Sequence, residues 1–234
     1  MKRFVRTALL LPLLLLFLVA AYLGLAAAWA ACSYDSLAAA LPLPHPGVLS
    51  PRQSAILLAV EDPDFHTHPG ISLAAGQGVA TLTSAVARDF YLRDGQAGAG
   101  LMQRFYAGVQ RCCKAIDFGR DAMALVLDAR MSKTRQLDYY IAHVYMGTQA
   151  GVQVRGLALA ALLYAGKPLA ALDAHEFVRL VAMIKAPNHY HPQRRPAALA
   201  ERVARIEALL AGKCRPAGWS DTLYEACTSP QGTP

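Results

Sequence analysis

The hydrophobic and polar positions along the chain repeat mostly with the period of an α-helix. After Ser50, which is a typical helix N-cap, an apolar run extends to the acidic pair Glu61-Asp62. Pro63 then ends this helix, because proline lacks a backbone donor and clashes with the previous turn. Few stretches alternate as strands do, so the pattern predicts a mainly α-helical domain. Further helices are predicted after Ser132, from the Asp173–Glu176 capping box to Pro187, and over residues 197–211.

The N-terminus has the pattern of a transmembrane anchor. A basic segment is followed by an uncharged run from Thr7 to Ser33, which is longer than the ~20 apolar residues that span a bilayer. The basic flank places the N-terminus in the cytoplasm. A cleaved signal peptide is the alternative, because Ala28-Trp29-Ala30 resembles a cleavage site, but the apolar run exceeds the usual length of such peptides. We therefore expect an uncleaved anchor, with the rest of the chain outside the inner membrane.

The length of 234 residues suits one domain with a substantial core, plus appendages. A short proline-rich segment, 42–46, separates the anchor from the first predicted helix of the domain, and the chain after the last helix has the composition of a loop. The predicted organisation is an anchor over 1–31, a linker over 32–49, a domain over 50–212 and a C-terminal tail over 213–234.

Charge and cysteine content narrow the partners and the compartment. The formal net charge is +7, of which Lys2, Arg3 and Arg6 contribute three, so the part expected outside the membrane carries +4. This mildly basic charge suits anionic lipid headgroups or a phosphate-bearing substrate. No nucleic-acid motif is present, so we expect no nucleic-acid partner. Five cysteines in an oxidising compartment permit disulfides. Cys214 and Cys227 are the preferred pair, because both lie in the tail.

Glu61 is the strongest candidate for chemistry. It stands at a helix end, with apolar residues on one side and Asp62 or His68 on the other, which favours a pKa suited to a general base. A solvated helix end with loop histidines is the alternative interpretation. The pairs His66/His68 and His189/His191 lack a cysteine or carboxylate at metal-site spacing, so no metal site is predicted.

Three runs resemble the motifs of family 51 glycosyltransferases, the peptidoglycan polymerases. Glu61-Asp62-x-x-Phe65-x-x-His68-x-Gly70 resembles the first motif. Residues 155–168 and 186–192 resemble the fourth motif and the end of the fifth, in the same order and with similar spacing. Residues 128–137 are most similar to the bifunctional penicillin-binding proteins. The resemblance covers roughly residues 50–210.

This resemblance implies a lysozyme-like helical domain behind a single-pass anchor, on the periplasmic side of the inner membrane. It also implies a reaction in which the 4-hydroxyl of a lipid-linked disaccharide attacks the anomeric carbon of a growing glycan chain and expels undecaprenyl pyrophosphate. Glu61 would be the general base, and Lys133, Arg155 and Lys167 would face the pyrophosphate. The lipid-linked precursor and the glycan strand are the implied partners. Assistance by Mg2+ or Mn2+ and contact with other cell-wall synthases stay open.

The second motif has two possible positions. The better-spaced match is Gln96–Phe105, which places Gln103 and Arg104 at the substrate. The rival match, Gly78–Thr83, keeps the Thr-x-Thr of the family pattern but comes too soon after Gly70 and lacks both glutamines of that pattern. In either position several hydroxyl and amide groups of the family pattern are missing.

The third motif departs further, because Arg120 stands where the family has its second essential glutamate. Asp117 lies three residues earlier, nearly one helical turn, and is the predicted replacement. Three functions therefore stay open: an active transferase, which we favour; a catalytically degraded scaffold that binds glycan, precursor or a synthase; and, least favoured, a lysozyme-like hydrolase. The predicted catalytic residues are Glu61 and Asp117, and the predicted substrate-binding residues are Asp62, Phe65, His68, Gly70, Gln103, Arg104, Lys133, Arg155 and Lys167.

Overall fold

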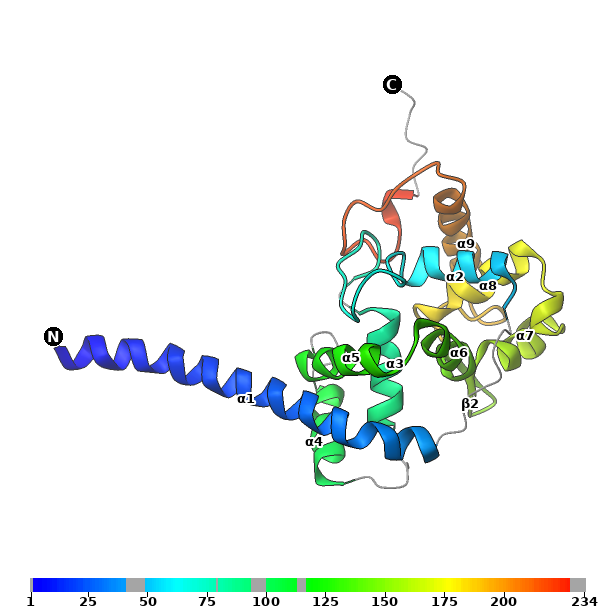
Figure 1. The fold of residues 1–234 in the computed structure, drawn as a ribbon. Helices are drawn as coiled ribbons and strands as arrows, with labels where there is room; N and C mark the ends of the chain where they lie inside the picture. The colour runs from blue at the N-terminus through cyan, green and yellow to red at the C-terminus, as the bar shows by residue number, and fades with distance from the viewer. Residues whose placement is uncertain (1, 41–48, 79, 94–99, 113–116, 228–234) are drawn as a thin grey trace.

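The computed structural model describes residues 2–40, 49–78, 80–93, 100–112 and 117–227. Over these residues the chain is mainly helical, which confirms the predicted fold class (Figure 1). The helices are α1 (Lys2–Ala40), α2 (Pro51–Glu61), α3 (Leu82–Leu92), α4 (Leu101–Cys112), α5 (Phe118–Arg130), α6 (Lys133–His143), α7 (Leu157–Ala165), α8 (Ala174–Ile184) and α9 (Pro196–Leu210), with short 3-10 turns at Leu169–Ala171 and Glu225–Cys227.

Local capping explains where several helices begin. Ser50 accepts a hydrogen bond from the Gln53 amide at the start of α2, and the Gln53 side chain accepts one in return. Asp173 forms the same reciprocal box with Glu176 at the start of α8. These starts were predicted. The N-cap of α3 is Thr81, whose hydroxyl oxygen accepts from the Ser84 amide.

A two-stranded antiparallel sheet, formed by β1 (Tyr145–Gln149) and β2 (Val152–Arg155), interrupts the helices. Arg155 pairs with Tyr145 at the open end of the hairpin, next to the C-terminus of α6. The hairpin was not predicted, because its strands are too short to show clear alternation. It carries Arg155 back to the body of the domain.

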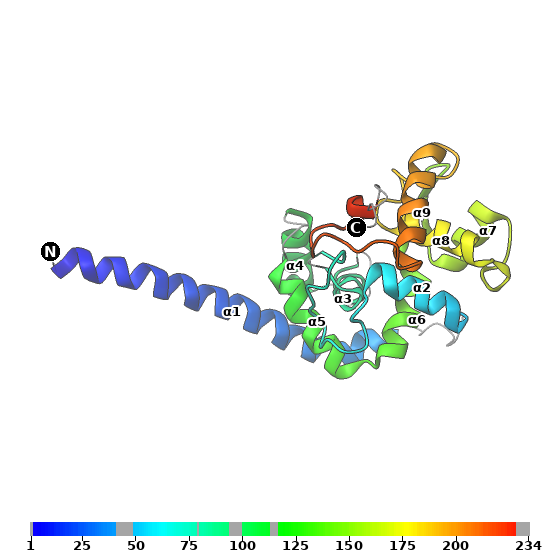
Figure 2. The same ribbon diagram turned by 90° about the horizontal axis from the view of Figure 1, so that it is seen from above.

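Helix α1 has two parts with different surroundings. It contains a stretch, Leu10–Ala40, long and apolar enough to cross a membrane. Its first half projects away from the domain, and its second half runs along α5 (Figures 1 and 2). In that second half Ala26, Ala30, Tyr34 and Leu37 are buried in the hydrophobic core. The helix reaches Ala40, so residues 32–40, expected in a linker, are helical, and residues 41–48 of that segment lie outside the described residues.

Because the second half of α1 is part of the core, its side chains should contribute to the stability of the whole domain. Tyr34 packs on Phe90 at a ring distance of 5.6 Å and donates a hydrogen bond to the Arg130 carbonyl. Tyr34→Ala is expected to lower the free energy of unfolding by about 3 kcal/mol, measured by chemical denaturation of the full-length protein in detergent. Phe17→Ala is the matched control, because the Phe17 side chain is 68% exposed. Equal losses from the two variants would contradict this account.

Candidate active site

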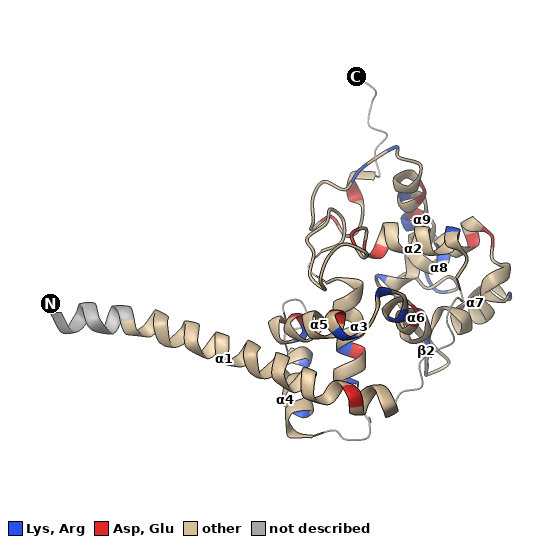
Figure 3. Ribbon diagram, in the orientation of Figure 1, with Lys and Arg blue, Asp and Glu red and all other residues tan. Residues whose placement is uncertain are grey.

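A cavity of about 530 Å³ lies where the C-terminal end of α2, helices α3 and α6, the hairpin and the end of α8 meet. Its charged lining residues come from separate parts of the chain: Glu61, Arg88, Asp89, Arg155 and Lys185. Figure 3 shows acidic and basic positions on the helices of the domain, whereas the coloured part of α1 is mostly tan. Among the predicted site residues, Glu61 and Arg155 line this cavity.

Glu61 is the last residue of α2 and is partly buried. One carboxylate oxygen accepts a hydrogen bond of 3.3 Å from the Tyr140 hydroxyl. Burial raises the pKa of Glu61 above its ordinary value of 4.5, and the positive charges of Arg202 and Lys185 oppose this shift. The raised pKa brings the carboxylate closer to the range in which a general base works at neutral pH.

Three cations line the same cavity. Arg155 donates to Asp89 at 3.2 Å and to the His143 carbonyl at 3.3 Å. Arg88 and Lys185 are both exposed, and within the described part of the chain neither has a hydrogen bond or an ion pair. Guanidinium and ammonium groups are the usual partners of phosphate oxygens. Two cations are therefore available to an anionic ligand, and a third is held in place by Asp89.

Most of the first motif builds the loop beyond Glu61. Asp62 is fully buried and accepts from the Leu82 amide at 2.7 Å. The Gly70 amide donates to Nδ1 of His68 at 2.9 Å, so Nε2 of His68 carries the proton that is shared with Asp62 at 3.0 Å. Gly70 has a φ of +115°, and a Cβ there would lie 2.9 Å from the Ala124 carbonyl oxygen. These contacts fasten the loop to α3 and α5.

Two of the predicted cations are engaged away from the cavity. Lys133 donates to the His68 carbonyl at 2.8 Å, pairs with Asp128 at 2.7 Å, and lies 4.8 Å from the centre of the buried Phe65 ring. Lys167 forms an exposed ion pair with Glu176. None of these side chains lines the cavity. Their observed contacts are structural, so their roles in substrate binding stay predictions.

The rival position of the second motif is the one at the cavity. Gln77, Ala80, Thr81 and Leu82 line its wall, and Thr83 donates a 2.7 Å hydrogen bond to Gln136 beneath it. Gln77 directly precedes Gly78–Thr83, so the expectation that this match lacks both glutamines of the family pattern was wrong for the first of them. The match at Gln96–Phe105 was favoured because the sequence gives only the number of residues between motifs and not their positions in space.

The better-spaced match lies elsewhere. The Gln103 carboxamide donates to the carbonyls of Tyr91 and Arg93 at the end of α3, and Arg104 is exposed. Neither residue lines the cavity. Gln96, at the start of this match, lies outside the described residues. The contacts of Gln103 therefore stabilise the junction of α3 and α4.

Asp117, which was expected to supply a second catalytic carboxylate, also lies away from the cavity. Asp117 is the buried N-cap of α5, where it accepts from the Arg120 amide at 3.1 Å. Arg120 is itself buried and pairs with Asp121 at 2.8 Å. Neither Asp117 nor Arg120 lines the cavity. Asp117 is thus positioned to stabilise a helix end, and its catalytic role stays a prediction without support from the geometry.

Among the described residues, Asp89 is the carboxylate that shares the cavity with Glu61. It accepts from the Tyr139 hydroxyl at 3.1 Å and also pairs with Arg93 and Arg155. The neighbouring Tyr140 bonds Glu61, so adjacent tyrosines of α6 hold the two carboxylates. Arg88, Asp89 and Lys185 could not be predicted as site residues, because each looks in sequence like an ordinary surface charge, within α3 or just after α8. Groups of three or more His, Cys, Asp or Glu side chains that could hold a metal ion do not occur in the described ranges.

The helical fold, a long apolar N-terminal helix that could anchor the chain in a membrane, and a cavity that combines carboxylates with cations define a protein of the lysozyme-like helical class. The transglycosylase family model matches residues 45–210, which is more than half of the chain. The chain therefore belongs to the transglycosylase family, the glycosyltransferase family 51 domain of class A penicillin-binding proteins.

The similar curated proteins are penicillin-binding proteins. Penicillin-binding protein 1B of Escherichia coli K12 is 33% identical over 168 residues, which is 66% of this chain and 18% of that protein. Penicillin-binding protein 1B of Vibrio cholerae serotype O1 is 33% identical over 152 residues, or 59% of this chain and 18% of that protein. Penicillin-binding protein 1A of Pseudomonas aeruginosa is 26% identical over 160 residues, which is 62% of this chain and 17% of that protein. The chain thus spans less than a fifth of these relatives.

Proposed function

We propose that this domain polymerises lipid-linked disaccharide into peptidoglycan strands and releases undecaprenyl pyrophosphate. The observation that carries the proposal is the cavity in which Glu61, with its raised pKa, shares a wall with Arg88, Arg155 and Lys185. Glu61 takes the proton of the acceptor 4-hydroxyl as that oxygen bonds to the anomeric carbon of the donor. The bond from this carbon to the pyrophosphate oxygen breaks, and the leaving group keeps the electron pair. The cations stabilise the charge that develops there.

An apolar groove supports a lipid-linked substrate and a membrane location. It has a volume of about 810 Å³ and lies between α1 and α5. Its rim includes Leu73 and Phe118, which are 64% and 62% exposed. Because Leu23 and Ala27 of the anchor helix form part of the groove, the apolar surface continues directly from the spanning helix to the domain. We infer that the domain rests on the periplasmic face of the inner membrane and takes its substrate from the bilayer.

A second candidate function is a scaffold that binds precursor, glycan or another cell-wall synthase without turnover. One observation favours it. Arg120 replaces the family's second glutamate, and the other carboxylate at the cavity, Asp89, is occupied by Arg93 and Arg155. A site of this kind keeps the groups that bind a pyrophosphate and lacks a free second carboxylate for catalysis.

A polymerisation assay separates the two functions. Full-length protein in detergent is incubated with labelled lipid-linked precursor and a divalent cation, beside an established transglycosylase under the same conditions. Glycan strands from this protein are the expected result. If the folded protein binds the precursor but forms no polymer, the enzymatic function is rejected and the scaffold function is supported.

Arg88 should contribute to donor binding, because it has no ionic partner in the described structure and lines the cavity. Arg88→Ala is expected to weaken binding of labelled precursor about tenfold, since a hydrogen bond to a charged group contributes roughly 1.5 kcal/mol or more. Fluorescence anisotropy in detergent measures this dissociation constant. Arg52→Ala is the matched control, because Arg52 is an exposed arginine of α2 that does not line the cavity. An equal loss of affinity in both variants would mean that the effect comes from the overall charge of the protein and not from this site.

A further inference from the structure

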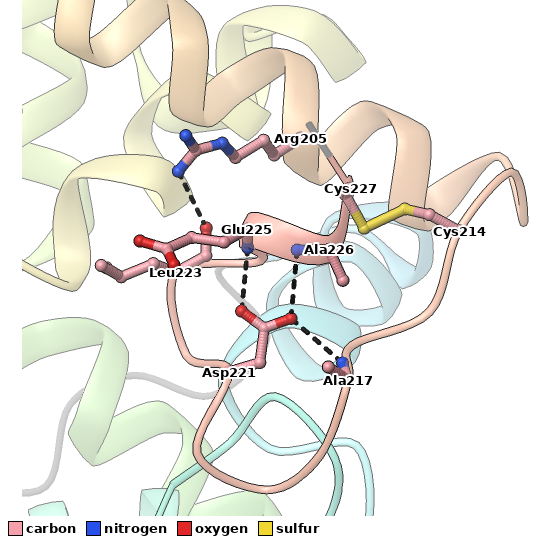
Figure 4. The surroundings of a disulfide bond; sticks show 8 residues. All are labelled: Arg205, Cys214, Ala217, Asp221, Leu223, Glu225, Ala226 and Cys227. Atoms are coloured by element: carbon pink, nitrogen blue, oxygen red, sulfur yellow. Dashed lines mark hydrogen bonds between the residues drawn. A yellow bond between two sulfur atoms is a disulfide. The ribbon is translucent and has the colours of Figure 1, made fainter. Parts of the chain in front are cut away.

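The segment from Cys214 to Cys227 is a compact loop closed by a disulfide between its ends, as predicted from the sequence (Figure 4). Asp221 organises its interior by accepting from the backbone amides of Ala217, Glu225 and Ala226. Arg205 of α9 donates to the Leu223 carbonyl from outside the loop. We call residues 214–227 the disulfide-closed tail.

The disulfide-closed tail holds the loop that forms one wall of the cavity. The amides of Gly76 and Gly78 donate to the carbonyls of Gly218 and Trp219 of the tail, at 2.9 and 2.7 Å. A Cβ on Gly76 would lie 2.6 Å from the Tyr224 ring, so the two backbones can approach this closely only because residue 76 is glycine. Residue 77 is thus fixed on both sides by the tail.

Gln77, between these two glycines, points to a ligand. Its side chain lines the cavity and is only 7% exposed, yet neither its amide nitrogen nor its oxygen has a hydrogen-bond partner within the described residues. A buried carboxamide without partners costs free energy. One donor and one acceptor at the end of a single side chain match neighbouring hydroxyl groups of a sugar.

The disulfide-closed tail also reaches the helix end that carries Glu61. The Tyr224 hydroxyl donates a 2.5 Å hydrogen bond to the carbonyl of Val60, the residue before Glu61. Tyr224 is 2% exposed and has a φ of +56°, a conformation that a bulky residue adopts only when its surroundings enforce it. Arg202 donates to the Thr222 carbonyl at 3.3 Å and lies 5.5 Å from the Tyr224 ring centre. The tail therefore holds the arginine whose positive charge acts on Glu61.

We propose that the disulfide-closed tail is a positioning element of the cavity: it presents Gln77 to a sugar of the glycan, and through Tyr224 it holds Glu61 in place. Opening the Cys214–Cys227 bridge then loosens this wall of the site. The consequence for catalysis rests on the proposed function, whereas the consequence for the cavity wall does not.

Hydrogen exchange with mass spectrometry tests the proposal on full-length protein in detergent. Cys32, Cys112 and Cys113 are first replaced by Ser, so that the only remaining cysteines are those of the tail. Treatment with a phosphine reductant, which converts the disulfide to two thiols and is itself oxidised, should speed exchange at Gly76 and Gly78 on the order of a hundredfold, as expected for releasing a loop of this length. A peptide covering α6 should exchange at an unchanged rate. Unchanged protection of residues 74–80 after full reduction would overturn the proposal.

Two variants keep the disulfide and separate the roles within the wall. Tyr224→Phe removes only the hydrogen bond to Val60 and is expected to lower kcat severalfold, with little change in KM for the precursor. Gln77→Ala is expected to raise KM about tenfold with a smaller change in kcat. If the parent forms no polymer, the exchange experiment still decides the role of the tail, and the proposed function alone fails. If polymer forms and neither variant changes its kinetics, the positioning roles are rejected.

Discussion

Glu61→Gln is expected to lower the rate of glycan polymerisation by at least about a hundredfold, because an amide cannot take the proton of the acceptor hydroxyl. The variant keeps the shape of the side chain and can still accept from the Tyr140 hydroxyl, which lies 3.3 Å from the Glu61 carboxylate. Precursor binding should therefore change little. The measurement is polymer yield against time for parent and variant, with the dissociation constant of the precursor determined in parallel.

The same substitution should make the folded protein more stable at neutral pH. Burial raises the folded-state pKa of Glu61 above 4.5, so the parent loses stability as the pH rises through that pKa. Glutamine does not titrate. The two proteins should therefore differ least below pH ~4.5, the ordinary pKa of the carboxyl, and the variant should be the more stable of the two at pH ~8.

Unfolding curves at the two pH values test this sign, because the other titrating groups are shared and largely cancel in the difference. A variant that is less stable than the parent at the higher pH would show that the Glu61 carboxylate is not penalised by burial. Loss of polymer together with a gain in stability would identify Glu61 as a residue retained for function at the expense of stability.

The second large effect is expected for Asp62→Ala, which should lower the stability of the fold without removing a group that takes part in the reaction. Asp62 is fully buried and accepts from the Leu82 amide and from His68. Alanine would leave both donors buried without a partner, so the free energy of unfolding should fall by about 3 kcal/mol or more. Chemical denaturation in detergent measures this loss.

Asp64→Ala is the matched control, because Asp64 lies in the same loop and is exposed, and among the described donors its carboxylate accepts a 3.3 Å bond from the Ser72 hydroxyl. The bond from the Thr67 hydroxyl goes to the Asp64 backbone carbonyl, which alanine keeps. It should change the free energy of unfolding by less than about 0.5 kcal/mol. A similar small change for Asp62→Ala would mean that the buried cluster of Asp62, His68 and Gly70 does not hold the loop, and that the acid next to Glu61 has another role.

Several features of this protein could be predicted from the sequence alone, because the interactions that cause them are local. The caps at Ser50 and Asp173 act on amides three residues away. The apolar run of α1 is sufficient by length to span a membrane. The family motif around Glu61 places a carboxylate at a helix end, and the Cys214–Cys227 pair follows from the cysteine positions in the tail.

The composition of the cavity was decided only by tertiary structure. Arg88 and Asp89 belong to α3 and Lys185 follows α8, and packing alone brings them to the end of α2. The same packing commits Lys133 to Asp128 and the His68 carbonyl, and it places the buried Asp117 at a helix N-terminus. A charged residue has no fixed role in sequence, because its partner is set by whichever group long-range packing brings within hydrogen-bond distance. The sequence by itself determined the helices, the apolar N-terminal run and the catalytic candidate Glu61, whereas the fold decided which charges surround Glu61.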